Sequence, residues 1–456
     1  MQALASLAVV GAGPKGLAIA AKRVALARTG REVPDLVLID RAGVATNWSG
    51  TSGYTDGRQP LSTPPEKDVG FPYAPSWGPA SGQVSDEVRR WSWQRYLIDQ
   101  GGLADWVDRG QPRPDHRAWH RYLRWVAGQL GVEPVLAEVV GIDLADGRWR
   151  LSTRRTSTGE PLTLDCDGLV LTGPGAPLRL PGQPDHHPRI LDGRSFWTAG
   201  AALSAGGPVE VCVVGSGETA GSITSALVGL LPEGSVIELV SDHGVLYTRG
   251  ESLTENRMYS DPDAAGWRQL AERHRREFLK RTDRGVFSVQ VQGLLDRAGL
   301  VRTLAGRVTH LEPVEAKVVV EVDYDQRRER LAFDWVVVAV GFDPLWFVPL
   351  LGRGARDALA EAVGEAPRPA ADPRGPGTGD RPRPGRPGPA AQAASADPGR
   401  ARPGPGVPQP LLPRPARRPG PRRLCRRPAA RPSRAWRGPP THNERSDVRR
   451  PTRRLR

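Results

Sequence analysis

The sequence predicts an α/β protein made of two Rossmann-like dinucleotide-binding domains with a disordered C-terminal tail. Short β-branched runs alternate with helix-like segments over residues 1–352, as in doubly wound parallel sheets. Two glycine loops, about 200 residues apart, each lie between such a run and a helix-like segment. From Arg353 onward the periodicity stops, and arginine and proline dominate the composition.

The first glycine loop, residues 11–16, follows the apolar run 7–10 and precedes a predicted helix over 15–28. In this motif one glycine permits a tight turn, the next lets the backbone approach a pyrophosphate, and the last lets helix and strand pack closely. The helix N-terminus adds unpaired N–H groups. The next strand, 36–39, leads into Asp40, whose carboxylate can accept from ribose hydroxyls. The residues predicted to contact this dinucleotide are Gly11, Gly13, Pro14, Gly16 and Asp40.

The second glycine loop, residues 215–221, follows the apolar run 209–214 and has Ala220 in the third small position. The strand after it, 236–240, leads to Ser241, where an NAD-selective site usually has an acid, and Arg249 follows nearby. This pattern favours NADP over NAD, because the 2′-phosphate needs a cation, although Asp242 argues the other way. The predicted contacts are Gly215, Gly217, Thr219, Ser241 and Arg249.

Two dinucleotide loops in one chain imply two nucleotides, most simply FAD at the first loop and NADPH at the second. Residues 169–175 and 338–344 read as strands that end in glycine, where the chain returns to the flavin domain, and Gly341 is predicted to contact cofactor there.

The formal net charge of +14 belongs to the tail. From Arg353 onward lie 25 of the 64 basic residues, all of them arginine, but only 8 of the 50 acidic residues, so that residues 1–352 are nearly neutral. Nucleic acid is therefore not an expected partner of the folded part. The three cysteines lack disulfide or zinc spacing, no apolar run approaches the roughly 20 residues of a membrane span, and the N-terminus lacks the charged region of a signal peptide. We expect a cytoplasmic protein without a metal site.

Seven segments of the chain resemble the flavin-dependent N-hydroxylating monooxygenases of siderophore biosynthesis. Within that group the sequence is most similar to the L-lysine N6-hydroxylases of mycobactin-type pathways, and the likeness extends over about residues 1–350. The segments that carry it are 48–50, 62–73, 92–97, 119–125, 250–256, 281–287 and 343–347.

The resemblance implies a reaction in which the flavin carries the chemistry and no catalytic side chain or metal is needed. NADPH reduces FAD, oxygen adds to give a C4a-hydroperoxyflavin, and the side-chain amine of L-lysine takes the distal oxygen to become a hydroxylamine. The protein's task is then to orient the amine and exclude water. The family also includes oligomers, so a homo-oligomer is expected.

The resemblance also assigns roles to single residues. Lys67 matches the lysine that holds the substrate carboxylate, and Asn256 matches a substrate-binding asparagine near the nicotinamide. Asp283 falls where ornithine-specific relatives have another asparagine, which suggests a substrate of different length. Trp48 is expected to flank the flavin. A surface lysine, a turn-capping asparagine and a core tryptophan remain the simpler interpretations of Lys67, Asn256 and Trp48.

The domain boundaries expected from these patterns are an FAD-binding domain with the substrate segment over 1–205, an NADPH-binding domain over 206–330, a return to the FAD domain over 331–352, and the tail over 353–456.

The tail invites the hypothesis of a shifted reading frame near residues 352–366. Relatives end in a Gly-Pro-Gly, Phe-Pro-Asn-Leu-Ser pattern, whereas this chain reads Gly-Pro-Gly at 404–406 and then VPQPLLPR. Codons exist that encode those eight residues and, one base later, encode FPNLSCL. Resequencing of the gene decides the hypothesis, which fails if the frame is unshifted and the tail is present in isolated protein.

Three functions remain open at this stage. The first is L-lysine N6-hydroxylation, and the second is N5-hydroxylation of L-ornithine or another flavin monooxygenase reaction. The third is an inactive remnant or a polyanion-binding protein, because an altered C-terminus would remove part of the site.

Overall fold

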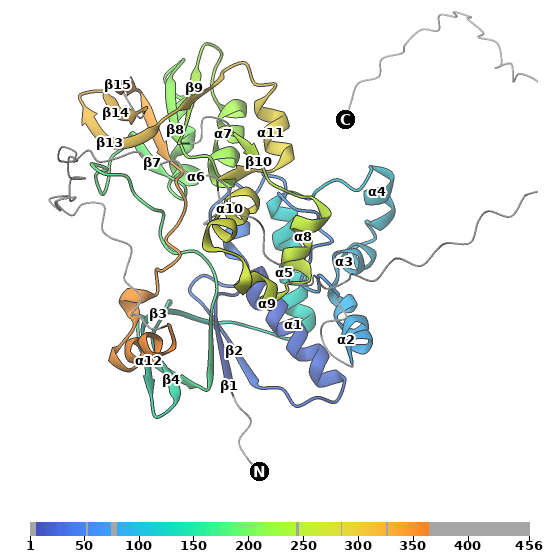
Figure 1. Ribbon diagram of the computed structural model, residues 1–456. Helices are drawn as coiled ribbons and strands as arrows, with labels where there is room; N and C mark the ends of the chain where they lie inside the picture. The colour runs from blue at the N-terminus through green and yellow to red at the C-terminus, as the bar shows by residue number, and fades with distance from the viewer. Residues whose placement is uncertain are drawn as a thin grey trace, which may run out of the picture. The chain divides into compact units, whose positions relative to one another are not determined.

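The computed structural model describes residues 6–51, 53–73, 80–242, 246–283, 285–324 and 327–363 (Figure 1). These residues form two larger sheets, each with a central strand that leads into one of the glycine loops, and two smaller sheets. The predicted α/β class with two Rossmann-like units is therefore confirmed.

The first sheet has the strand order β5-β4-β3-β2-β1-β6. Strand β1 pairs in parallel with β2 and β6, so that Val9 lies beside Leu38 on one side and Val170 on the other. Strands β3, β4 and β5 continue the sheet as an antiparallel meander. The bounds are β1 Ser6–Val10, β2 Asp35–Asp40, β3 Val135–Ala145, β4 Arg148–Arg155, β5 Pro161–Cys166 and β6 Gly168–Leu171.

Helices α1 and α5 pack against each other and share a core with the segment that contains Lys67. Trp91, Trp93 and Tyr122 are buried in this core, and Asp115 caps α5 by accepting from the Ala118 N–H. The helices are α1 Pro14–Arg28, α2 Ser81–Val88, α3 Trp93–Asp99, α4 Leu103–Asp108 and α5 His116–Leu130, with 3₁₀ turns at Thr46–Trp48 and Arg89–Trp91.

The second large sheet is fully parallel, with the order β12-β9-β8-β16-β7. Its central residues Val211, Cys212 and Val213 are fully buried, as expected for a strand covered on both faces. The bounds are β7 Ile190–Asp192, β8 Glu210–Val214, β9 Val236–Ser241, β12 Val301–Ala305 and β16 Trp335–Val338, and the helices are α6 Phe196–Ala199, α7 Glu218–Leu230 and α11 Val289–Leu295.

Further elements are inserted after β9 and β12. Three short helices lie between the two strands of a small parallel pair, and a three-stranded antiparallel sheet follows β12. The bounds are β10 Tyr247–Thr248, α8 Leu253–Ser260, α9 Ala264–Gln269, α10 Glu272–Thr282, β11 Val286–Phe287, β13 Arg307–Val314, β14 Lys317–Asp323 and β15 Arg328–Phe333; 3₁₀ turns span Gly200–Ser204 and Val348–Leu350.

Two of the expected domain boundaries are wrong. Strand β7, placed by the sequence in the 1–205 domain, and strand β16, placed in the 331–352 return, both belong to the second sheet, where Val336 pairs with Ile190 and Cys212. The chain therefore enters the second unit before residue 190 and leaves it after Val338. A parallel strand takes its partners from distant segments, so apolar runs alone do not assign it to a sheet.

The expected start of the disordered tail at residue 353 is also wrong. Helix α12 spans Arg353–Val363, buries Ala355 completely and contacts β3. The Asp143 carboxylate accepts from the Ala355 N–H at 3.1 Å and so stabilises the helix start from another strand. The rest of the tail lies outside the described residues, as does the end of the stretch 352–366 in which the frame shift was placed.

No helix in the described ranges combines the length and apolar character needed to cross a membrane. The same ranges contain no cluster of side chains able to hold a metal ion, and Cys166 and Cys212 are buried free thiols.

Candidate functional site

The first glycine loop turns sharply between β1 and α1. Gly11 has φ +109°, and a Cβ there would lie 2.1 Å from Thr172 Oγ1, a hydroxyl fixed by its bond to the Val10 carbonyl. A Cβ at Gly16 would lie 2.2 Å from the Gly11 carbonyl oxygen. At Gly13, by contrast, a Cβ would have no described neighbour within 4 Å, because this residue borders a cavity. Pro14 also borders the cavity. It is the first residue of α1, where the backbone N–H has no partner within the helix, so the missing N–H of proline does not weaken the helix.

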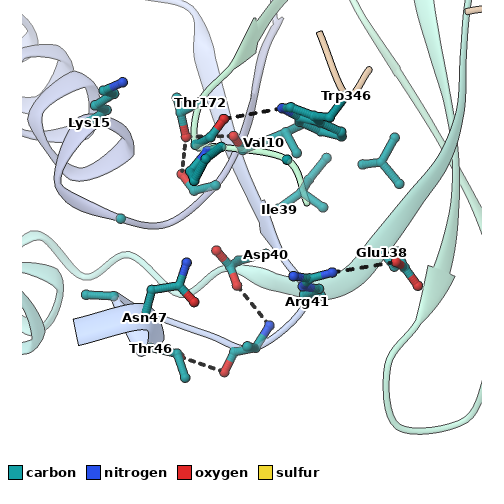
Figure 2. Close-up of a pocket in the computed structure, with 18 of the residues that line it drawn as sticks. Val10, Lys15, Ile39, Asp40, Arg41, Thr46, Asn47, Glu138, Thr172 and Trp346 are labelled. Carbon is teal, nitrogen blue, oxygen red and sulfur yellow. Dashed lines mark hydrogen bonds and ion pairs between the residues drawn. The ribbon is translucent and has the colours of Figure 1, made fainter. Parts of the chain in front are cut away.

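The cavity beside this loop measures about 710 Å³ and is large enough for an extended dinucleotide. Figure 2 shows Thr172 and Trp346 above it in the view and Asp40 and Asn47 below it. Its wall brings together segments far apart in sequence, since Trp346 donates to the Gly173 carbonyl at 3.2 Å.

Asp40 fixes the geometry of both neighbouring turns. Its Oδ2 accepts from the Ala12 N–H at 3.0 Å, and its Oδ1 accepts from Ala42 and Gly43 at 2.8 and 3.0 Å (Figure 2). Each carboxylate oxygen can accept more than one hydrogen bond, so Asp40 retains capacity for a ribose hydroxyl in the cavity that it borders.

Trp48 also borders the cavity and contacts the His116 ring edge-on, with centroids 4.7 Å apart. His116 bonds Thr55 Oγ1 at 2.9 Å, and its burial lowers its pKa to about 4. The imidazole that supports Trp48 is therefore neutral over the working range of most enzymes.

We expect acid to weaken the fold through His116. Between pH 6.5 and about 4 the unfolded chain takes up a proton at this position and the folded chain does not. This stability is therefore present above pH 6.5 and is lost as pH falls through about 4, by up to roughly 3 kcal/mol. Denaturant unfolding at pH 7.5 and 5 should show a smaller pH difference for His116→Asn than for the native protein. The exposed His186→Asn is the control and should retain the native difference.

The second glycine loop repeats the geometry of the first. Gly215 has φ +140°, and a Cβ there would lie 2.4 Å from the Ala339 carbonyl oxygen, at the end of β16. Gly217 precedes α7, and Thr219 lies in its first turn beside Gly193. Ser241 is buried at the end of β9.

Arg249 faces the start of α7. Its Nη2 lies 3.9 Å from Glu218 Oε2, and its buried Nε has no hydrogen-bond partner among the described residues. The same Glu218 oxygen accepts from the Ser288 N–H, and burial raises the pKa of this carboxyl. An unpaired guanidinium donor at a glycine loop is suited to a phosphate oxygen.

Two linker segments connect the two units side by side. Pro177 and Phe342 form an antiparallel bridge, and Leu178 donates to the carbonyl of Gly341, which has φ +102°. The Phe342 ring contacts Tyr54, a cavity residue, at 4.9 Å. Gly341 thus belongs to the connection between the units and does not border the cavity.

Lys67 and Asn256 meet across the two units. The Lys67 Nζ donates to Asn256 Oδ1 at 2.9 Å, and the Asn256 amide donates to the Glu251 carbonyl at 2.8 Å. Burial lowers the pKa of Lys67; the Glu251 carboxylate opposes this effect, and Arg249 and Arg113 add to it. A partly buried cation is therefore held between a flavin-domain loop and α8.

Asp283 is the third residue that the resemblance assigns to the substrate. It is exposed at the C-terminal end of α10, two residues beyond Arg281, whose carbonyl accepts from the Gly250 N–H.

The sequence analysis did not predict a role for two residues of this region, Arg113 and Glu218. Arg113 donates to the Ser62 carbonyl and, at 2.9 Å, to Gln290 Oε1 of α11, and so also links the two units. Glu218 lies in the predicted glycine loop, but its contact with Arg249 joins residues that are 31 positions apart. Contacts between residues that are far apart in the chain produce no periodic pattern in the local sequence, so they could not be predicted.

The comparisons with known proteins agree with one another. The family described as L-lysine 6-monooxygenase/L-ornithine 5-monooxygenase matches residues 84–344. An L-lysine N6-monooxygenase, MbtG, of Mycobacterium sp. (strain MCS) is 42% identical over 79% of this chain and 82% of its own length. The solved structure of the lysine monooxygenase NbtG from Nocardia farcinica superposes with a TM-score of 0.68 at 36% identity, covering 80% of this chain and 87% of that one. An ornithine N-hydroxylase of Kutzneria sp. 744, solved with reduced FAD, NADP⁺ and L-ornithine, shares the fold at 18% identity and a TM-score of 0.62, covering 77% and 84%.

Proposed function

Because the chain belongs to the family of L-lysine 6-monooxygenases and L-ornithine 5-monooxygenases, we propose that its Lys67–Asn256 pair binds the amino acid that it hydroxylates. The 2.9 Å bond between these side chains carries the proposal, because it places a partly buried cation where the two units meet. An ammonium has three donors, so Lys67 can keep Asn256 and still donate to a substrate carboxylate.

The reaction is the N6-hydroxylation of L-lysine in the biosynthesis of a mycobactin-type siderophore. The enzyme is a flavin monooxygenase that depends on FAD and NADPH. FAD, when bound and reduced, supplies the activation of molecular oxygen. The residues of this chain bind the amino acid by its carboxylate, orient its side-chain amine and limit the access of water.

The glycine loops fit these two cofactors. At the first loop, the space beside Gly13 and the cavity of about 710 Å³ suit the pyrophosphate and the extended body of FAD. We assign this cradle to Gly11, Gly13, Pro14, Gly16 and Asp40, and the flank of the flavin to Trp48. At the second loop, the unpaired Nε of Arg249 suits a phosphate of NADPH, and Gly215, Gly217, Thr219 and Ser241 complete the assignment.

One assay tests both the identity of the substrate and the coupling of NADPH oxidation to hydroxylation. The full chain, loaded with FAD and supplied with NADPH in air, should form hydroxylamine from L-lysine at least about tenfold faster than from L-ornithine at equal concentration, since a shorter chain leaves the amine out of reach of the reacting oxygen. Hydrogen peroxide is measured in parallel. Faster hydroxylamine formation from L-ornithine contradicts the lysine assignment, and NADPH consumption that yields only peroxide contradicts coupling in this chain.

The segment after residue 363 affects how well NADPH oxidation is coupled to hydroxylamine formation. We retain as a proposal that its reading frame is shifted, and that the native ending closes the amine end of the pocket. We also propose that the enzyme works in the cytoplasm and self-associates, which cell fractionation and sedimentation velocity would test.

A further inference from the structure

The residue after Lys67 is an aspartate whose carboxylate is surrounded by donors. Asp68 Oδ1 accepts from the Tyr73 hydroxyl at 2.7 Å and from the Gly70 N–H at 3.0 Å. Its Oδ2 accepts from the Trp93 N–H at 2.8 Å. No ion pair to Asp68 is present among the described residues. The carboxylate is thus held entirely by neutral donors.

Two of these donors lie in the segment that contains Lys67, and the third lies on a helix. Tyr73 and Gly70 belong to the segment itself, whereas Trp93 is the first residue of α3 and has an N–H left unpaired by its helix. Asp68 therefore ties the Lys67 loop to a helix of the aromatic core.

The rest of the segment leaves Lys67 little freedom once this link exists. The Lys67 N–H donates to the Pro64 carbonyl at 3.0 Å, and Val69 is buried. The Val69 N–H faces the hydroxyl of Tyr122, which in turn donates to the Trp91 carbonyl at 2.8 Å. Asp68 thus bonds Trp93 of this core, while the neighbouring Lys67 bonds Asn256 of α8.

We propose that Asp68 is the positioning residue for Lys67: its carboxylate, bound to Trp93, Gly70 and Tyr73, holds the loop so that the Lys67 ammonium meets the substrate carboxylate. The proposal rests on the substrate role of Lys67 proposed above. Asp68 itself contacts neither substrate nor cofactor, and it acts on Lys67 through the peptide bond that joins them. A side chain with a general structural role would instead affect the domain as a whole.

Amine labelling tests the positioning without any substrate. The chain has five lysines, so the acetylation rate of each by dilute acetyl N-hydroxysuccinimide ester can be followed by peptide mass spectrometry. In Asp68→Asn, which removes one acceptor while preserving shape, Lys67 should be labelled roughly tenfold faster, the factor expected for one lost hydrogen bond to a charged group. Lys280 and Lys317 in the same samples should keep their rates.

The matched control is Asp143→Asn. Asp143 is also an aspartate of this domain that accepts from backbone N–H groups, including the Ala355 N–H at the start of a helix, but it lies on β3. This variant should lower stability without changing the labelling of Lys67. If Asp68→Asn does not fold, Tyr73→Phe removes one of the three donors and should accelerate labelling in the same direction.

A double-mutant cycle then asks whether Asp68 acts through Lys67. With FAD-loaded protein and calorimetric titration of L-lysine, Asp68→Asn should weaken binding about tenfold in the native background and have no further effect in the Lys67→Ala background. An equal loss in both backgrounds, or unchanged labelling of Lys67, overturns the proposal. If Lys67→Ala alone leaves L-lysine affinity intact, the substrate role of Lys67 fails, and the labelling experiment still decides whether Asp68 positions it.

Discussion

Replacing Lys67 with alanine should lower kcat/KM for L-lysine by about two orders of magnitude or more. The ammonium is partly buried and bonds Asn256 at 2.9 Å, so its loss removes the cation that we place against the substrate carboxylate. Truncating one partner of such a buried charge pair typically costs about 2–5 kcal/mol. Hydroxylamine formation measured over a range of L-lysine concentrations should show most of this loss in KM, because the carboxylate lies far from the reacting amine.

The flavin half of the reaction should survive the Lys67→Ala substitution. Lys67 does not border the cavity at the first glycine loop, so FAD affinity and the oxidation of NADPH to give peroxide should stay within about twofold of native values. Lys280→Ala, which removes an exposed lysine of α10, is the matched control and should leave KM unchanged. If Lys67→Ala hydroxylates L-lysine with a native KM, another group binds the carboxylate and the site must be redrawn.

The sequence predicted those features of the fold that depend on residues close together in the chain. Strand, glycine turn and helix follow one another over residues 6–28 at the first loop and 210–230 at the second. The predicted helix over 15–28 differs from α1 by one residue. At each loop the first glycine has a positive φ and closely approaches a neighbouring segment. Only glycine tolerates both conditions, so the residue type alone predicts its role. Resemblance to a family added Lys67 and Asn256, which lie 189 residues apart and which no periodicity connects.

The parts that the sequence did not predict depend on pairing over long distances. Strands β7 and β16 lie on one sheet although about 140 residues separate them, and each is too short for its partner to be read from an apolar run. Helix α12 was missed although its sequence is rich in strong helix formers, because residues from 353 onward were grouped with the arginine- and proline-rich tail. Its start is stabilised by Asp143 of a distant strand. Asp68 lies within the family-like segment 62–73, but its bond with the Trp93 N–H joins residues 25 positions apart and could not be predicted from the sequence.

Replacing Gly13 with alanine should weaken FAD binding on the order of 10- to 100-fold while leaving the fold intact. Gly13 has φ −80° and ψ −169°, which alanine adopts without strain, and a Cβ there meets no described atom within 4 Å. The methyl group would instead occupy the space next to the start of α1, where a pyrophosphate needs to reach the backbone N–H groups. Overpacking of this kind costs about 1–3 kcal/mol. The loss is measured by fluorescence titration of apoprotein with FAD, and thermal unfolding without FAD should show a Tm close to native.

Two other glycines separate this effect from damage to the loop. Gly11→Ala should lower the Tm of the apoprotein, because its Cβ would meet Thr172 Oγ1 at 2.1 Å and φ is +109°. Gly30→Ala has a similar positive φ of +79° but open space around the Cβ, so it should show only the backbone strain of about 1–2 kcal/mol and keep native FAD affinity. A Gly13→Ala protein that binds FAD as tightly as the native chain would mean that the pyrophosphate does not approach this loop.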